Sequence, residues 1–152
     1  MGLDMCLEEK ISMVGYNASN KNEVININLY GEDDTLKIKL CDIKSIRIEI
    51  AYWRKANMIH KYIVDNHASG VDECQEIEVS CKDLLELQKI CKEVLMNHNK
   101  APELLPITSG FFFGGDDYEE WYYEDIQFTF KMIEELNIKK DDARWFIYRA
   151  SW

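Results

Sequence analysis

Hydrophobic and polar residues alternate with a period of two in three stretches of the first 52 residues. These stretches are residues 24–30, 35–40 and 46–52, and residues 3–8 are a candidate for a first strand. Alternation of this kind is typical of half-buried β-strands. Residues 31–34 (GEDD) have the composition of a turn, so we expect the first two stretches to form a hairpin.

The period changes to that of a helix near Trp53. The apolar positions that follow fall on one helical stripe, which consists of Ala56, Ile59, His60, Ile63, Val64 and His67. Residues 66–70 (NHASG) carry the small and polar residues that end a helix. We therefore expect a helix that begins near Trp53 and ends before Gly70.

The second half of the chain predicts two more helices and two more strands. Residues 77–79 form a short strand, after which Ser80 and Asp83 have the spacing of a capping box. The helix that they begin has an apolar face made of Leu84, Leu87, Ile90, Cys91, Val94 and Leu95. A last helix is expected over residues 117–137, with Tyr118, Tyr122, Ile126, Thr129, Ile133 and Leu136 turned inward. Residues 144–151 are typical of a final strand.

These elements predict an α+β fold, in which about three helices pack against an antiparallel sheet. No internal repeat or low-complexity linker interrupts the 152 residues, so we interpret residues 1–152 as a single domain. Four Trp, eight Tyr and six Phe are more aromatic residues than a core of this size hides. We therefore expect a homo-oligomer, most simply a two-fold dimer.

Composition and charge exclude several kinds of partner. No apolar run approaches the roughly 20 residues that span a membrane, and the first residues lack the pattern of a signal peptide. The net charge of −10 disfavours duplex nucleic acid, because Lys and Arg drive binding to its phosphates. The five cysteines include no Cys-x-x-Cys pair, so we expect reduced thiols, no metal site and no cofactor.

The first candidate site lies at the start of the helix near Trp53. On a helical projection His60 falls inside the apolar stripe, while Trp53 and Asn57 fall along one edge, with Arg54 and Lys61 beside them. An aromatic plane next to cations suits a nucleotide-like or phosphorylated ligand. The alternative is a hydrogen-bonded core histidine beside an ordinary solvated face.

A long aperiodic segment, residues 97–116, is the second candidate. Such segments are often functional, and this one is apolar enough to need a place to pack. Ser109 and Gly110 could present backbone amides to an anion, with Phe111 and Phe112 beside them. We expect residues 105–114 to pack against residues 53–61 and enclose a pocket. The alternative is an apolar plug over the core.

Asp125 is the third feature, because it interrupts the inward face of the last helix. A buried carboxylate needs a partner, and Arg54, His60 or Arg149 could supply it. His60 with Asp125 is the one acid–base couple that the sequence suggests. No nucleophile or metal motif accompanies it, so we assign no catalytic residue and favour a binding protein over an enzyme.

Four blocks of the sequence together resemble a family of small phage and prophage proteins of unassigned function. The blocks are residues 1–5 (MGLDM), 51–61 (AYWRKANMIHK), 104–114 (LLPITSGFFFG) and 117–125 (DYEEWYYED). The resemblance covers most of the chain after Tyr52 and supplies no catalytic residues. It implies the cytoplasm of an infected or lysogenic bacterial host, where small phage proteins often disarm host defences.

Taken together, these features favour a protein that sequesters a small, anionic, nucleotide-like ligand, such as a host immune signal. The alternative is an inhibitor that docks its acidic face on a host protein. An enzyme acting on a phosphorylated small molecule ranks third. The expected ligand-binding residues are Trp53, Arg54, Asn57, His60, Lys61, Ser109, Gly110, Phe111, Phe112 and Asp125.

Overall fold

The computed structural model describes residues 2–13, 23–28, 35–110, 113–115, 117–139 and 142–152. The chain divides into two compact units. The larger unit comprises Met1–Glu9 and Glu49–Trp152, and the smaller unit comprises Lys10–Ile48. The interpretation of the chain as one domain stays a prediction.

The smaller unit contains the predicted hairpin. Strand β2 (Val24–Asn28) pairs antiparallel with β3 (Thr35–Lys39), and Ile25 lies opposite Ile38. A short 3-10 turn, η2 (Leu40–Asp42), follows. The predicted turn at residues 31–34 lies outside the described residues.

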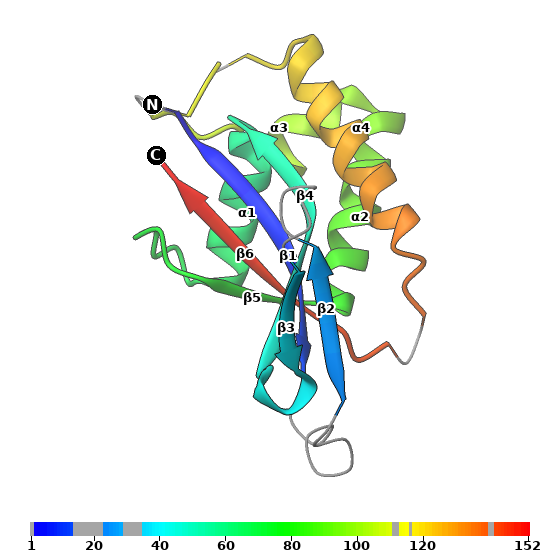
Figure 1. Cartoon of the computed structure of the whole chain (residues 1–152). Coiled ribbons are helices and arrows are strands. Elements are labelled where there is room, and N and C mark those ends of the chain that lie inside the picture. Colours follow the sequence, from blue (N-terminus) through cyan, green and yellow to red (C-terminus); the bar gives the residue numbers. More distant parts are fainter. Residues whose placement is uncertain (1, 14–22, 29–34, 111–112, 116, 140–141) are drawn as a thin grey trace. The chain divides into compact units, whose positions relative to one another are not determined.

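An α+β fold is confirmed, because the structure combines helices with an antiparallel four-stranded sheet (Figure 1). The strand order is β4-β1-β6-β5. The strands are β1 (Asp4–Ser12), β4 (Ser45–Arg54), β5 (Ile77–Ser80) and β6 (Trp145–Ser151). Alternate side chains such as Met5 and Leu7 in β1 are fully buried, as a sheet with one covered face requires.

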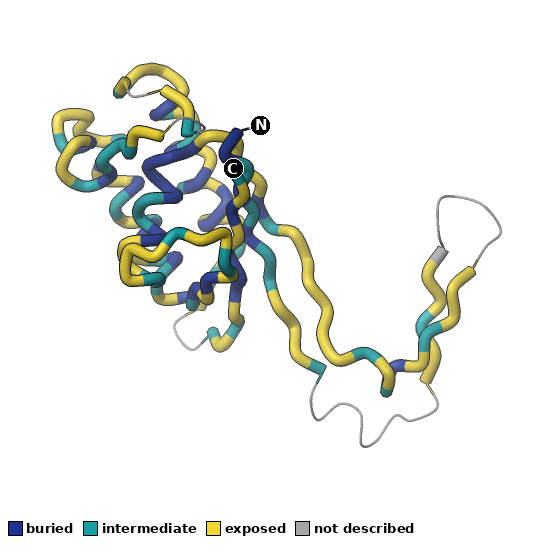
Figure 2. The backbone as a smooth tube through the Cα atoms, turned by 90° about the vertical axis from the view of Figure 1, so that its left-hand side faces the viewer, coloured by how far each residue is buried: buried dark blue, intermediate teal, exposed yellow. Residues whose placement is uncertain are grey.

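The helices gather on one side of this sheet, and the buried residues lie between the two layers (Figures 1 and 2). They are α1 (Asn57–His67), α2 (Cys81–Met96), α3 (Ala101–Leu104) and α4 (Glu120–Glu135), with the 3-10 turn η3 (His98–Lys100) before α3. Among the described residues, no helix combines the length and the apolar character that crossing a membrane requires. The largest fully buried side chains are Leu3, Met5, Leu7, Ile59, His60, Ile63, Leu84, Leu105, Ile126, Ile133, Phe146 and Tyr148.

The start of α2 follows the predicted capping box. The Ser80 hydroxyl accepts a hydrogen bond from the Asp83 amide (3.3 Å), and the Asp83 carboxylate accepts one from the Ser80 amide (2.8 Å). Two of the amides that a helix N-terminus leaves without partners are thereby satisfied. The segment after α2 differs from expectation, because residues 98–104 form η3 and α3, with Pro102 in the first turn of α3.

Candidate functional site

The connection between β4 and α1 differs from the prediction, and the difference decides which side chains can meet a ligand. The strand continues through Arg54, and α1 begins at Asn57. Lys55 joins them in the left-handed region (φ 65°), and its amide donates to the Leu3 carbonyl (2.7 Å). Strand alternation therefore continues to the end of β4, so Trp53 is buried and Arg54 is exposed.

Asn57 ties the segment after α3 to the first turn of α1. Its buried amide nitrogen donates to the carbonyl oxygens of Phe113 (3.1 Å) and Gly115 (2.9 Å). Its amide oxygen accepts from the Thr108 backbone amide (3.4 Å). The expected packing of this segment against the helix is confirmed for its described residues. Asn57 acts as a clamp for the loop backbone.

Glycine is required where the loop approaches Lys55. Gly114 has a φ of 96°, and a Cβ atom placed on it would lie 2.9 Å from the Lys55 Cβ and 3.2 Å from the Lys55 carbonyl oxygen. A Cβ atom at Gly110 would lie 2.6 Å from Cδ2 of Phe113. A side chain at position 114 would push the loop away from Lys55, and one at position 110 would displace the Phe113 ring.

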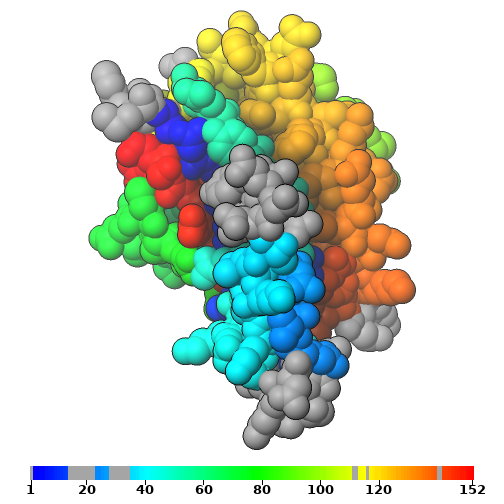
Figure 3. Space-filling model, in the orientation of Figure 1, coloured from blue at the N-terminus to red at the C-terminus, as the bar shows by residue number. Residues whose placement is uncertain are grey.

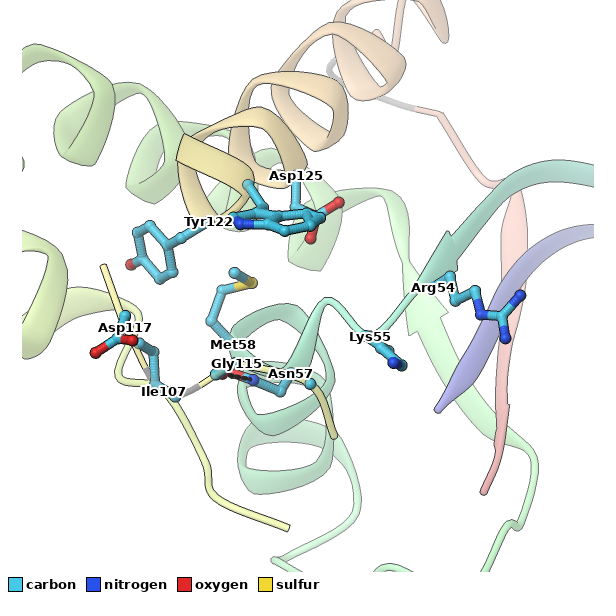
Figure 4. A pocket seen from close by; sticks show the side chains of 11 residues that line it. Arg54, Lys55, Asn57, Met58, Ile107, Gly115, Asp117, Tyr122 and Asp125 are labelled. Carbon is cyan, nitrogen blue, oxygen red and sulfur yellow. Dashed lines mark hydrogen bonds between the residues drawn. The ribbon is translucent and has the colours of Figure 1, made fainter. Parts of the chain in front are cut away.

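A cleft of about 460 Å³ opens where these segments meet α4. It falls within the usual range of small-molecule sites, roughly 300–1,000 Å³. Figure 3 shows the segment after α3 and the start of α4 gathered beside the end of β4, and Figure 4 shows the cleft from close by. The cleft is lined by Arg54, Lys55, Asn57, Met58, Ile107, Gly114, Gly115, Asp117, Trp121, Tyr122 and Asp125.

One face of α4 forms a wall of the cleft. Trp121, Tyr122 and Asp125 are three and four residues apart, so they lie on the same side of the helix. The buried Tyr122 hydroxyl donates to the Leu105 carbonyl (2.8 Å), which fixes the start of α4 over the loop. Trp121 is 72% exposed, which leaves its indole ring available for stacking.

The Asp125 carboxylate stands in this wall without the partner that we expected. Within the described residues, it forms no hydrogen bond or ion pair. Burial, with a smaller contribution from the charge of Glu124, raises the pKa of Asp125 to about 6. The predicted pairing was wrong for two of its candidates: His60 pairs with Asp72, and Arg149 pairs with Glu76.

Arg54 and Lys55 are the two cations of the cleft. Both side chains are exposed, and neither forms an ion pair within the described part of the chain. In Figure 4 they stand at one end of the cleft, while Asp117 and Ile107 lie at the other end. The cleft is therefore polarised along its length, with positive charge at one end and carboxylates along the rest.

Trp53 and His60 do not reach the cleft, which corrects the sequence interpretation. The Trp53 indole nitrogen donates to the Thr129 hydroxyl of α4 (2.9 Å) inside the core. The His60 ring is 2% exposed. Its Nδ1 lies 2.8 Å from the Tyr148 hydroxyl and its Nε2 lies 3.0 Å from the Asp72 carboxylate. The hydrogen-bonded core histidine was the better of the two alternatives.

The remaining predicted site residues lie away from the cleft or outside the residues that the structure describes. Lys61 pairs with Asp65 one helical turn further along α1 (2.7 Å). Ser109 and Gly110 are exposed but do not line the cleft. Phe111 and Phe112 lie outside the described residues. Arg54, Asn57 and Asp125 are the predicted residues that the structure brings together.

Sequence reasoning missed several residues that line the cleft. These are Lys55, Met58, Ile107, Gly114, Gly115, Asp117, Trp121 and Tyr122. A signal for two of them was present, because Trp121 and Tyr122 precede Asp125 by one helical turn and had to share its face. In the described part of the chain, no three His, Cys, Asp or Glu side chains are grouped so as to hold a metal ion.

Comparison with known proteins identified no relative of this chain. No protein-family model, no curated protein and no solved structure matches the chain. The resemblance to small phage proteins stays a prediction.

Proposed function

We propose that the cleft binds a small, anionic, nucleotide-like ligand and that the protein acts by sequestering it. One observation carries the proposal. A single cleft of ligand size combines two cations at one end with an exposed indole and, on α4, a carboxylate that has no partner among the described residues. The cations suit a phosphate, the indole suits an aromatic ring stacked on it, and the carboxylate suits the polar edge of that ring.

The cation end fits the phosphate. Arg54 can bind phosphate oxygens in a bidentate manner, and Lys55 adds a compact charge next to it. The exposed backbone at Gly114 and Gly115 borders the same cleft, so main-chain groups are within reach of the ligand. A neutral ligand would leave both cations unused, and a purely aromatic one would leave the polar lining without partners.

The wall of the cleft that α4 forms fits the nucleobase. Stacking of a nucleobase on an exposed aromatic side chain contributes about 1–3 kcal/mol, and Trp121 offers such a surface. Met58 and Ile107 supply apolar contacts from the opposite side. The cleft groups thus hold both ends of a nucleotide, which suits capture of a signal molecule in a defended host.

Replacing Arg54 and Lys55 together with alanine should weaken nucleotide binding by about 100-fold or more, because each charged hydrogen bond contributes about 1.5–3 kcal/mol. Both side chains are exposed, so the fold should be unchanged. Isothermal titration calorimetry with a panel of mononucleotides measures the effect.

Lys61→Ala is the matched control, because it removes a cation of α1 that is paired with Asp65 and does not line the cleft. It should bind as the native chain does. Native affinity in the Arg54 and Lys55 double variant, or equal losses in both proteins, would contradict the proposal.

The second candidate function, inhibition of a host protein, is favoured by the surface at the start of α4. There Glu119, Glu120 and Glu124 are exposed around Trp121, an acidic surface with an aromatic centre. Function would then be lost on charge reversal of the three glutamates and kept in the Arg54 and Lys55 variant. Formation of a homo-oligomer stays a prediction.

A further inference from the structure

We infer that the ring held in the cleft is guanine, recognised by the Asp125 carboxylate through its N1–H and 2-amino groups. This inference rests on the proposed function and names the ligand class of the same site. Three observations lead to it: the position of Asp125 beside the stacking surface, the lack of a partner for its carboxylate among the described residues, and its electrostatic surroundings.

The position follows from the helix. Residues four apart on a helix surface are neighbours, with Cβ atoms about 5–6 Å apart. Asp125 follows Trp121 by four residues, and both line the cleft. A base stacked on the indole ring therefore presents one of its edges to the Asp125 carboxylate. Figure 4 shows Asp125 on α4 next to Tyr122, over the opening that Met58 faces from below.

The chemistry of the edge selects the base. An ionised carboxylate has two acceptor oxygens and no donor, so it matches an edge with two adjacent N–H donors. Guanine presents such an edge through N1–H and its 2-amino group. Adenine and cytosine place an acceptor beside their amino group, and uracil places its single N–H between two carbonyl oxygens. Asp125 has no partner of its own within the described residues, so both oxygens are available to the ligand.

The charges around Asp125 set the pH range. Arg54, Lys55 and Asp117 line the same cleft, and Glu124 is adjacent on α4. The pKa of Asp125 is raised to about 6, so the carboxylate is the main form above pH 6 and the carboxylic acid below it. Because guanine needs the carboxylate, GMP affinity should rise with pH up to about 6 and level off above it. Adenine needs the acid, so the ratio of GMP affinity to AMP affinity should rise with pH through about 6, because the second ionisation of the phosphate near the same pH affects both nucleotides alike.

The test is calorimetric titration of the full chain with GMP, IMP, AMP and XMP at pH 7.5. IMP retains N1–H but lacks the 2-amino group, so it should bind roughly tenfold or more weakly than GMP, and AMP more weakly still. Asp125→Asn presents one acceptor and one donor. It should lose at least roughly tenfold in GMP affinity and gain affinity for XMP, whose C2 carbonyl accepts from the amide.

Glu134→Gln removes an exposed carboxylate of the same helix and should leave all four affinities unchanged. The gain for XMP shows that the Asp125→Asn protein is folded and has switched its preference. Equal binding of GMP and AMP by the native chain, or native GMP binding by Asp125→Asn, would overturn the guanine inference and leave the proposed function standing. Absence of binding by every nucleotide to the native chain would overturn both.

Discussion

Replacing Trp53 with alanine should lower the free energy of unfolding by about 3–5 kcal/mol. The Trp53 side chain is 3% exposed and packs in the core between the sheet and α4. Truncation leaves a cavity and removes the hydrogen bond from the indole nitrogen to the Thr129 hydroxyl. A domain has only about 5–15 kcal/mol of stability in total, so this one change removes a large part of it.

Trp53→Phe is the graded control, because it keeps one aromatic ring in the core and loses the five-membered ring with its N–H donor. It should cost about 1 kcal/mol beyond the small loss of volume. Urea denaturation followed by circular dichroism measures both variants. A Trp53→Ala protein as stable as the native chain would show that Trp53 is not part of the core. Loss of the Trp53 indole should also affect the cleft wall, because the Thr129 hydroxyl that it contacts donates to the Asp125 carbonyl oxygen (2.7 Å).

Replacing His60 with leucine should cost about 2–4 kcal/mol, because it leaves two buried or half-buried polar groups without a partner. The Tyr148 hydroxyl belongs to a fully buried side chain, and Asp72 is 28% exposed. In a neutral imidazole, Nε2–H donates to Asp72 and Nδ1 accepts from the Tyr148 hydroxyl. The three side chains thereby connect α1, β6 and the segment before β5.

A double-mutant cycle with Tyr148→Phe tests this arrangement. The double variant should be more stable than His60→Leu alone, because the phenylalanine no longer buries an unpaired hydroxyl. Unfolding free energies from urea titrations give the coupling between the two side chains. Strictly additive losses would mean that the His60–Tyr148 hydrogen bond does not contribute to stability.

Local pattern was sufficient for most of the secondary structure. The alternation in β2, β3 and β4, the capping box at Ser80 and the apolar stripes of α1, α2 and α4 are each determined by neighbours in sequence. The boundary between β4 and α1 is not determined by sequence neighbours, because Trp53 fits both the strand period of two and the helix period of 3.6. A strand places it in the core, while a helix places it on an edge, and packing against Thr129 decides between them.

The site was harder to predict because its geometry depends on contacts between distant segments. Asn57 was predicted as a ligand residue, and nothing in the sequence shows that its amide binds the backbone of residues 108–115. The partner of His60 was sought in Asp125 and is Asp72, which lies only twelve residues away in a segment without periodicity. Asp125 was identified because a carboxylate on an otherwise apolar face is visible from the sequence alone.

The central claim, that the cleft beside Trp121 holds a nucleotide, is tested most directly by the indole N–H signals of the four tryptophans. A ¹⁵N-labelled sample is titrated with GMP and then with AMP, and the signals are assigned by single Trp→Phe variants. The Trp121 signal should shift, together with the amides of Gly114 and Gly115, while the buried Trp53 signal stays in place. A Trp121 signal that does not move under saturating nucleotide, or a shift confined to Trp145, would contradict the proposed site.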